Sequence, residues 1–317
     1  MRWFLKHLRL RVNARAFLWS RFSMVIVRLN GGLGNQMFQY ALGRSVALKY
    51  GVPLRFDLQA LAVDTKRTFS LPVWRIKGQI ASRSDILRMR VRNKLSNKLF
   101  AHRPYYRHPV IIERDFTFDP NVLAAPRECW LIGYWQSEKY FCNIAEQIRA
   151  EFSPASNLSA ESLEIERKIM AMQGRSVFLH IRRGDYAHDP HTTQAHGNCS
   201  LEYYQRAASL ISEQVTDPCF FVFSDEPEWA RENLHLPFCT TVVSHNRPGN
   251  ACEVGTEHED LWLMSRCRHA ILANSSFSWW GAWLNAEQSR IVVAPKQWFG
   301  TLTCDTRDLL PSEWIRL

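Results

Sequence analysis

The sequence lacks several signatures that mark common classes of protein. It contains no Walker A phosphate loop, no D-x-D pair suited to a catalytic divalent metal and no internal repeat of short period. No stretch reaches the roughly 18 apolar residues that a membrane-spanning helix requires. Without a catalytic cation, any phosphate charge would have to be met by arginine side chains and by helix ends.

The cysteines also lack a recognisable pattern. None of the eight cysteines forms a C-x-x-C pair, and no histidine cluster completes a zinc pattern. Several of them lie in apolar runs, where a free cysteine behaves as a small hydrophobic residue. We therefore expect free thiols in a reducing compartment and no metal site.

What is present is an ordinary globular composition with a basic balance. The chain has 317 residues, of which 46% are hydrophobic and 22% are charged, and this length suggests about two domains. The net charge is +10, from 40 Lys and Arg against 30 Asp and Glu. Such an excess fits an anionic ligand or an anionic surface and does not report on the fold.

Two segments hold much of the positive charge. Residues 1–23 carry six basic residues and no acid among aromatic and aliphatic residues. They are either an amphipathic segment on an anionic membrane or an extension ahead of an alternative start at Met24. Between Lys66 and Arg107 the single acid is Asp85, and a helix is predicted over 86–100 with Ser84-Asp85 as its cap. That helix presents either a solvated face or a face for anionic lipid.

The hydrophobic pattern predicts two α/β domains. In the first half, a strand over 25–29, a glycine-rich turn, a helix over 37–50 and a strand over 54–56 form a β-loop-α-β unit. From residue 176 onward strands and helices alternate, which is typical of a parallel sheet with right-handed crossovers. We divide the chain into a basic extension (1–23), an N-terminal domain (24–153) and a C-terminal domain (154–317). The strand ends of both domains should face a shared cleft.

The stretch from Val177 to Tyr186 is the most informative one. An apolar strand ends in Arg182, Arg183, Gly184 and Asp185. Ligands of open α/β sheets bind beyond the carboxyl ends of the strands, and guanidinium groups match phosphate oxygens. The stretch therefore indicates a phosphate site, with a surface turn and a local Arg–Asp ion pair as the alternative.

The glycine-rich turn over 30–36 resembles a nucleotide-binding turn only in part. Its pattern is G-G-x-G followed by Asn35, not the G-x-G-x-x-G of dinucleotide-binding folds. The glycines, with Gly32 at their centre, allow a close approach of backbone to a ligand, with helix N–H groups aimed at it. A purely structural turn explains them equally well.

Two further strand ends carry polar groups. Asp225 follows one apolar strand, and Asn274, Ser275 and Ser276 follow another. Because parallel strands end at the same edge of a sheet, these residues should lie near Arg182 and bind a nucleoside diphosphate. Asp225 could accept from guanine, and the serines could hold phosphate. Helix capping accounts for all three residues if no ligand binds.

Several segments, taken together and in order, resemble glycosyltransferase family 11, the galactoside α-1,2-fucosyltransferases. They are N-G-G-L-G-N-Q-M-F-Q-Y (30–40), H-I-R-R-G-D-Y (180–186), F-S-D-E (223–226) and the run from Asp260 to Leu284. H-G-N-C-S-L-E-Y-Y (196–204) resembles bacterial members that act in O-antigen assembly. The similarity runs from Met24 to about residue 300 and leaves residues 1–23 out.

This resemblance implies a GT-B-like α/β fold, with two Rossmann-like domains facing a central cleft. It implies inverting transfer of L-fucose from GDP-β-L-fucose to the 2-hydroxyl of a terminal galactoside, with no metal and no other cofactor. The acceptor could be lipid-linked, and nucleic acid is not an expected partner. The absence of an anchor favours a cytoplasmic enzyme, with peripheral contact at the inner face of the membrane as one option. The implied catalytic residues are Arg182 and Asp185, and the implied donor-binding residues are Gly32, Asn35, His180, Arg183, Asp225, Asn274, Ser275 and Ser276.

The identity of the general base stays open at this stage. Asp185 is our first choice because it follows the phosphate arginines, and Glu253, Glu257, Glu259 and His196 are alternatives. We expect His180 to shape the strand end rather than to transfer protons. Two other classes of function remain: a dinucleotide-dependent oxidoreductase that uses the glycine-rich turn, and a basic binding module without catalysis.

Overall fold

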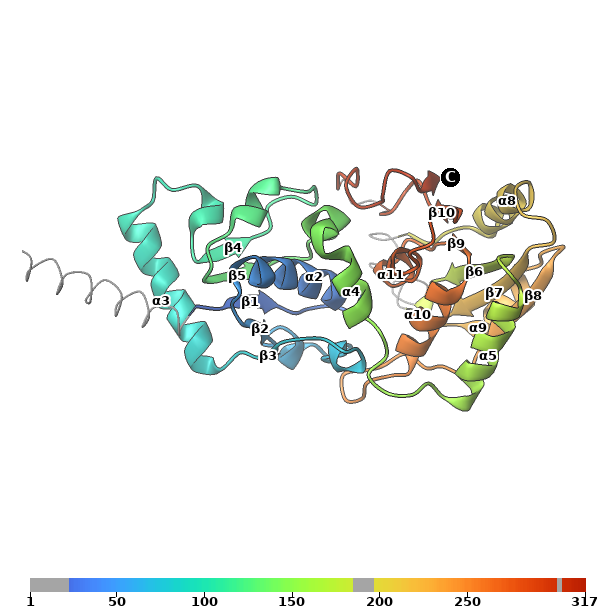
Figure 1. The fold of residues 1–317 in the computed structure, drawn as a ribbon, viewed down its shortest axis with the longest axis horizontal. Helices are drawn as coiled ribbons and strands as arrows, with labels where there is room; N and C mark the ends of the chain where they lie inside the picture. Colours follow the sequence, from blue (N-terminus) through green and yellow to red (C-terminus); the bar gives the residue numbers. More distant parts are fainter. Residues whose placement is uncertain (1–22, 185–196, 301–303) are drawn as a thin grey trace, which may run out of the picture.

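The structure is a computed structural model that describes residues 23–184, 197–300 and 304–317. It contains two parallel sheets side by side, with helices packed around them (Figure 1). We call the part around the first sheet, up to Glu151, the N-terminal half, and the part from Ala160 onward the C-terminal half. The proposed domain boundary between residues 153 and 154 stays a prediction.

The N-terminal half is built on a sheet with strand order β3-β2-β1-β5-β4. All of its strand pairs are parallel. Its elements are β1 (Val25–Arg28), α2 (Leu33–Tyr50), β2 (Leu54–Asp57), β3 (Gln79–Ile80), α3 (Arg83–Leu99), β4 (Val110–Ile112), β5 (Cys129–Ile132) and α4 (Ala145–Glu151), with short 3₁₀ helices at Leu61–Val63, Leu71–Val73, Tyr105–Arg107, Pro120–Ala124, Glu138–Tyr140 and Cys142–Ile144.

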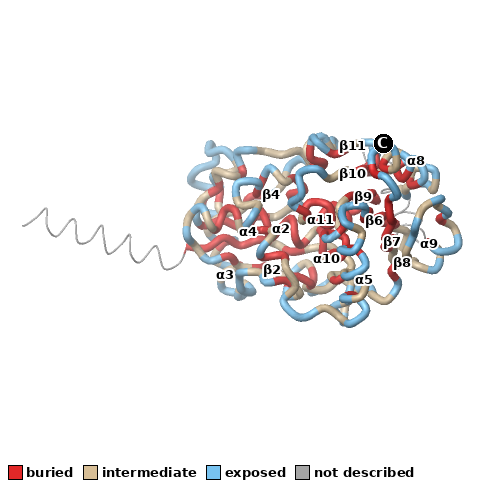
Figure 2. The backbone as a smooth tube through the Cα atoms, turned by 45° about the vertical axis from the view of Figure 1, so that its right-hand side comes forward, coloured by how far each residue is buried: buried red, intermediate tan, exposed pale blue. Residues whose placement is uncertain are grey.

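The C-terminal half is built on a sheet with strand order β11-β10-β9-β6-β7-β8, again parallel throughout. Its elements are α5 (Ala160–Ala171), β6 (Ser176–Ile181), α8 (Leu201–Ser212), β7 (Cys219–Ser224), α9 (Pro227–Asn233), β8 (Cys239–Val243), α10 (Glu257–Arg266), β9 (His269–Ile271), α11 (Ser276–Leu284), β10 (Val292–Ala294) and β11 (Ile315–Arg316). β6 is buried along its whole length and β7 up to its last residue, as the colours of Figure 2 indicate. The predicted GT-B-like α/β fold with two parallel sheets is confirmed.

A cluster of aromatic side chains holds the two halves together. α11 carries Trp279, Trp280 and Trp283, all buried. The ring of Phe38 on α2 lies 4.5 Å from that of Trp279 and 4.8 Å from that of Trp280. Trp280 also donates its indole N–H to the Gly34 carbonyl at 2.9 Å. These tryptophans are core residues, and they fix α11 against α2.

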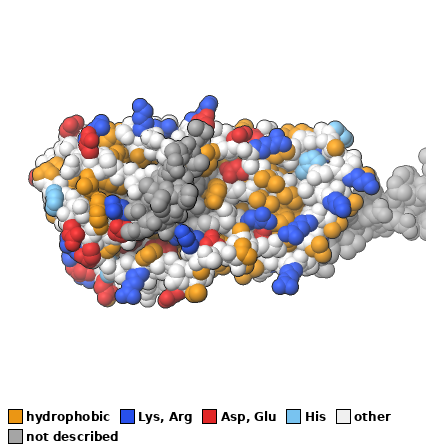
Figure 3. All heavy atoms as spheres, turned by 180° about the vertical axis from the view of Figure 1, so that it is seen from behind, with side chains coloured by type: hydrophobic (Ala, Val, Ile, Leu, Met, Phe, Trp, Pro, Cys, Tyr) orange, Lys and Arg blue, Asp and Glu red, His pale blue; other side chains and the backbone are white. Residues whose placement is uncertain are grey.

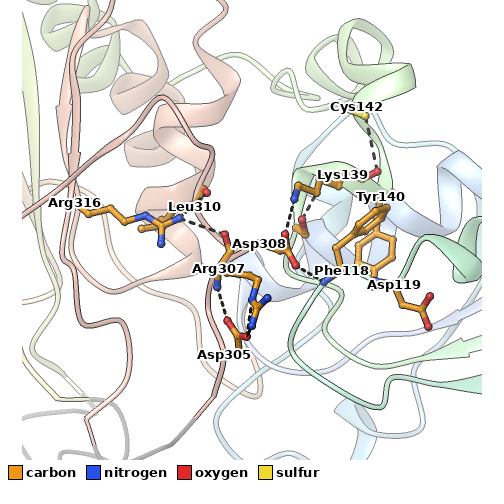
Figure 4. A network of polar contacts seen from close by, with 11 residues as sticks. Phe118, Asp119, Lys139, Tyr140, Cys142, Asp305, Arg307, Asp308, Leu310 and Arg316 are labelled. Carbon is orange, nitrogen blue, oxygen red and sulfur yellow. Dashed lines mark hydrogen bonds and ion pairs between the residues drawn. The ribbon is translucent and has the colours of Figure 1, made fainter.

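A second connection joins the C-terminal segment to the N-terminal half (Figure 4). Asp308 accepts a hydrogen bond from the backbone N–H of Phe118 at 3.0 Å and pairs with Lys139 at 2.5 Å. Trp279 donates its indole N–H to the nearby Leu309 carbonyl. Residues far apart in the sequence therefore hold the halves at two separate places.

Two local expectations are corrected. α3 begins at Arg83 rather than at residue 86, because Ser82 and Asp85 form a reciprocal capping box one turn earlier than predicted. Cys219 and Cys239 form a disulfide and are not free, since the parallel register of β7 and β8 places them opposite each other with Cα atoms 4.8 Å apart. The other six cysteines are free.

Candidate active site

A pocket lies between the two halves, where strands of both sheets end. It is lined by residues in the last positions of β6 and β7, by residues that follow β1, β6, β7 and β9, and by residues of α10 and two loops. They are Gly32, Leu33, Gly34, Asn35, Arg67, His180, Arg182, Phe223, Ser224, Asp225, Asn246, Pro248, Glu257, Asp260, Met264, Ser275, Ser276 and Phe277. Seven of the ten predicted site residues are among them: Gly32, Asn35, His180, Arg182, Asp225, Ser275 and Ser276.

Two helix N-termini from opposite halves meet at this pocket. A Cβ atom on Gly34 would lie 2.6 Å from the backbone carbon of Ser276 and 2.7 Å from the amide nitrogen of Phe277, so only glycine permits this approach. Gly32 caps α2 without a side-chain hydrogen bond, whereas the Ser275 hydroxyl accepts from the Phe277 N–H at the start of α11. The positive ends of both helix dipoles and their N–H groups therefore meet where an anion would bind.

The glycine-rich turn is held by side-chain amides rather than by backbone alone. Gln36 donates to the carbonyls of Gly31 and Thr68 at 2.9 and 2.8 Å, and its oxygen accepts from the Ser70 N–H. Asn35 accepts a hydrogen bond from Gln136 at 2.7 Å. Because Gln36 is fully buried, its three bonds tie the turn to the loop over residues 67–70.

Arg182 is oriented by Asp225. The guanidinium Nη1 lies 2.9 Å from one carboxylate oxygen of Asp225, and the other oxygen accepts from the backbone N–H of Arg183 at 3.0 Å. A Cβ atom on Gly184 would come within 2.3 Å of Asp225 Oδ2, so the glycine of R-R-G-D is needed for this contact. Asp225 therefore holds both the side chain of Arg182 and the backbone of Arg183, and its predicted contact with guanine stays a prediction.

The structure does not bring Arg183 and Asn274 to the pocket lining. Arg183 turns away, pairs with Glu226 at 3.1 Å and stacks over Trp229 at 3.7 Å. Asn274 binds the carbonyls of Gly197 and Trp298 and so holds two loops together. Successive residues of an extended chain point to opposite sides, which separates Arg183 from Arg182.

The five candidates for the general base differ in where they lie relative to the pocket. Asp185 and His196 lie outside the described residues. Glu253 is exposed and does not line the pocket, and Glu259 accepts hydrogen bonds from Ser159 at the start of α5. Of the four alternatives to Asp185, Glu257 is the one that lines the pocket in the described part of the chain.

His180 is a neutral group in this site. Burial, reinforced by the charge of Arg182, lowers the pKa of its imidazole to about 3. Its Nδ1 is buried and has no hydrogen-bond partner within the described chain. A neutral imidazole can offer a hydrogen bond to a sugar hydroxyl, but it cannot serve as a cationic acid at neutral pH.

Two charged residues that sequence reasoning did not assign to the site, Asp260 and Arg67, also line it. Asp260 accepts from the Asn246 side chain at 2.7 Å, and burial raises the pKa of its carboxyl to about 7 against this hydrogen bond. Arg67 reaches the pocket from the N-terminal half, where Asp64 accepts its backbone N–H at 3.0 Å. Asp260 begins one of the quoted motifs, whereas Arg67 had no signal beyond its place in a basic tract.

Arg67 and Glu257 approach the pocket from opposite halves. Burial raises the pKa of the Glu257 carboxyl, while backbone hydrogen bonds and the charges of Arg67 and Arg182 act in the other direction. The pocket therefore combines two guanidinium groups with three carboxyl groups, and burial raises the pKa of two of these, Glu257 and Asp260.

The described residues contain no group of three His, Cys, Asp or Glu side chains that could hold a metal ion. Among the helices of the described chain, none combines the length and the apolar character that crossing a bilayer requires.

Comparison with known proteins places this chain among glycosyltransferases. An alpha-1,2-colitosyltransferase of Escherichia coli is 32% identical over 307 residues, which cover 93% of this chain and 99% of that protein. The O-antigen biosynthesis glycosyltransferase WbnK of Escherichia coli is 30% identical over 91% of this chain and 99% of its own length. The galactoside alpha-(1,2)-fucosyltransferase 2 of Sus scrofa is 25% identical over 80% of this chain and 67% of its own.

The family model described as Glycosyl transferase family 11 matches residues 7–317. The match begins within the basic extension, which corrects the expectation that residues 1–23 lie outside it. With nearly the whole length matched and two relatives at or above 30% identity, the chain belongs to glycosyltransferase family 11.

Proposed function

We propose that the enzyme transfers L-fucose from GDP-β-L-fucose to the 2-hydroxyl of a terminal galactoside, with inversion and without a metal ion. The family and the relatives named above support a glycosyltransferase, and two of those relatives carry the α-1,2 linkage in their names. Family membership also argues against the oxidoreductase and the non-catalytic binding module. The donor, the acceptor and the metal independence are our proposal.

One observation carries the proposal: the positive groups of both halves converge on a single pocket. The N-termini of α2 and α11 meet there, and Arg182 and Arg67 line it from opposite sides. A nucleoside diphosphate carries the negative charge that such an arrangement would bind, since helix ends and guanidinium groups both favour phosphate.

The reaction follows from this placement of charge. The acceptor hydroxyl oxygen forms a bond to C1 of the sugar while the bond between C1 and the β-phosphate oxygen breaks. The electron pair leaves with GDP, and Arg182, held by Asp225, stabilises the charge that develops on the β-phosphate. The acceptor proton passes to a carboxylate, for which Asp185 stays our first choice and Glu257 the alternative.

The environment of the pocket suggests further roles. Asp225 positions Arg182, and its contact with guanine stays a prediction. Asp260 and Glu257 are the remaining carboxyl groups of the lining, and either can accept from the amino and imino groups of the base. His180 Nδ1 would accept a hydrogen bond from a hydroxyl of the transferred sugar.

A second donor deserves a direct comparison, because one relative is a colitosyltransferase. Colitose is fucose without its 3-hydroxyl, so the two donors would fit the same pocket. A site that hydrogen-bonds the 3-hydroxyl rejects the deoxy sugar strongly, because a buried polar group is then left without a partner. A site that accepts colitose discriminates much less against the added hydroxyl.

The experiment measures GDP release from GDP-fucose and from GDP-colitose over a panel of terminal β-galactosides, with EDTA present throughout. Acceptor-dependent release from GDP-fucose, with an α-1,2 linkage in the product by NMR, is the expected result. Release from GDP-colitose alone would replace the donor and keep the reaction type. If release failed in EDTA and returned when divalent metal was added in excess of the chelator, the proposed charge stabilisation would be overturned.

The cellular setting is also a proposal. Bacterial O-antigen relatives support a glycan acceptor, which a lipid carrier could present at the inner face of the membrane to a cytoplasmic enzyme. Product formation with a lipid-linked glycan but not with the free glycan would identify that form of the acceptor.

A further inference from the structure

α3 carries a row of apolar side chains on its outer face. Leu87, Val91, Leu95 and Leu99 follow one another at intervals of four residues, and 62%, 51%, 52% and 63% of their surfaces are exposed. Residues four apart lie one above the other on a helix. We call these four residues the α3 stripe. A solvated helix normally presents polar residues at such positions, so an exposed stripe indicates a binding surface.

The opposite face of the same helix anchors it to the protein. Ile86 and Met89 are buried and pack with Met24, Ile26 and Trp130. Ser96, also buried, hydrogen-bonds the His108 side chain at 3.0 Å. The exposed stripe is therefore not explained by loose packing of α3. The helix already has one apolar side that faces the core, and the stripe is a second apolar side.

Positive charge flanks the stripe. Arg90, Lys94 and Lys98 are exposed and lie along one side of it, and the exposed Arg83 precedes it by one helical turn. On the other side Arg88 and Arg92 pair with Glu128 at 3.5 and 2.7 Å. The single acid of the helix, Asp85, is engaged by the capping box with Ser82. The outer face of α3 thus combines apolar residues with a net positive field.

α3 lies at the end of the N-terminal half that is remote from the C-terminal half (Figure 1). Much of the helix is exposed (Figure 2). Basic side chains also predominate over acidic ones on the rear face of this half (Figure 3). A flat surface could therefore reach the stripe without blocking the pocket.

Charge decides which occupant fits the stripe. A second copy would bring one basic helix against another, and residues 1–23 carry six basic residues and no acid. Like charges at close range disfavour both contacts. The occupant must offer both an apolar surface and negative charge. An anionic bilayer offers both, because its acyl chains contact the apolar stripe and its headgroups bind the Lys and Arg side chains.

We propose that α3 docks the enzyme on an anionic lipid surface, with the stripe inserted at the headgroup boundary. This surface orients the protein and takes no part in the chemistry of the pocket. The proposal does not depend on the identity of donor or acceptor, because lipid binding and GDP release are measured separately.

The test uses the full chain and vesicles of phosphatidylcholine with or without 30% phosphatidylglycerol. The combined variant L87S/L95S/L99S removes most of the stripe and keeps every charge. The matched control is L163S/M170S on α5, where both side chains are also exposed. Vesicles with a photoreactive group in the acyl chain then locate the inserted residues by mass spectrometry of the cross-linked peptides.

The wild type and the control are expected to sediment with anionic vesicles and to be released by salt, with the stripe variant bound at least about tenfold more weakly. Cross-links should fall within 87–99, and GDP release with a soluble acceptor should be unchanged in the variant. Equal binding by the stripe variant would overturn the proposal, as would cross-links confined to residues 1–22. A wild-type dimer that the variant abolishes would assign the stripe to a second copy instead.

Discussion

Replacing Arg182 by alanine tests the proposed chemistry most directly. Its guanidinium is the group we expect to meet the charge that develops on the β-phosphate. Loss of one preorganised donor to a developing oxyanion typically costs about 2.7–4 kcal/mol, or about two to three orders of magnitude in kcat. We therefore expect kcat to fall at least about a hundredfold, measured as acceptor-dependent GDP release at saturating donor.

The same substitution also disturbs the fold, so stability must be measured beside activity. Asp225 would lose the partner that lies 2.9 Å away, and its side chain is only 9% exposed. Breaking a buried ion pair costs about 3–5 kcal/mol, and the 20% exposure of Arg182 places the expected cost near the low end. Urea unfolding should show this loss. The double variant R182A/D225N should recover much of the stability, because no unpaired carboxylate remains, but none of the activity.

Arg183 provides the matched control. It precedes the same Gly184, but its guanidinium pairs with Glu226 and stacks on Trp229 away from the pocket. R183A should therefore keep kcat within about threefold and lose about 1 kcal/mol or less of stability. Near-normal turnover of R182A, or equal losses in R182A and R183A, would refute the assignment of the phosphate charge to Arg182.

Further predictions concern the rest of the pocket. G34A should weaken GDP binding at least tenfold and lower stability, because its Cβ would collide with α11 backbone, whereas G32A, with the nearest atom 3.9 Å away, should have a much smaller effect; calorimetry and urea unfolding measure both. R67A should lower GDP affinity about tenfold, equivalent to about 1.4 kcal/mol, while K66A at the exposed neighbouring position should not, and equal affinities in calorimetry would exclude a role for Arg67. Burial raises the pKa of Asp260 to about 7, so its protonated carboxyl contributes fully to stability below about pH 4, and this contribution is lost as the pH rises towards 7. The free energy of unfolding of D260N should therefore depend less on pH over that window. Parallel wild-type and D260N curves would contradict the burial argument.

Some parts of the site could be predicted from local pattern because strand ends are local features. Val177 to Ile181 is an apolar run, and the residue after it must leave the sheet at the carboxyl edge. The same reasoning applies to Asp225 after β7 and Ser275 after β9. Since parallel strands share an edge, three segments far apart in the sequence could be placed in one pocket.

Other parts could not be predicted, because they depend on contacts across the fold. Local pattern does not distinguish Arg182 from Arg183, and only the family resemblance gave them different roles. In the fold, the side chain that Asp225 contacts is that of Arg182, and Asp225 is more than forty positions away. Arg67 enters the site only because Gln36 ties its loop to the glycine-rich turn. The disulfide of Cys219 and Cys239 likewise depends on the register between β7 and β8.

The sequence alone determined the alternation of strands and helices, the parallel sheets and the polar groups at the strand ends, because hydrophobic period and turn residues act over a few positions. Only the tertiary structure decided which of these groups line one pocket and which stabilise the fold through contacts elsewhere. The contact of Gly34 with the first turn of α11 illustrates the difference. Local sequence sets where each of the two helices begins. The two helix N-termini come close together, and form the anion site between them, only because the tryptophans of α11 pack against α2.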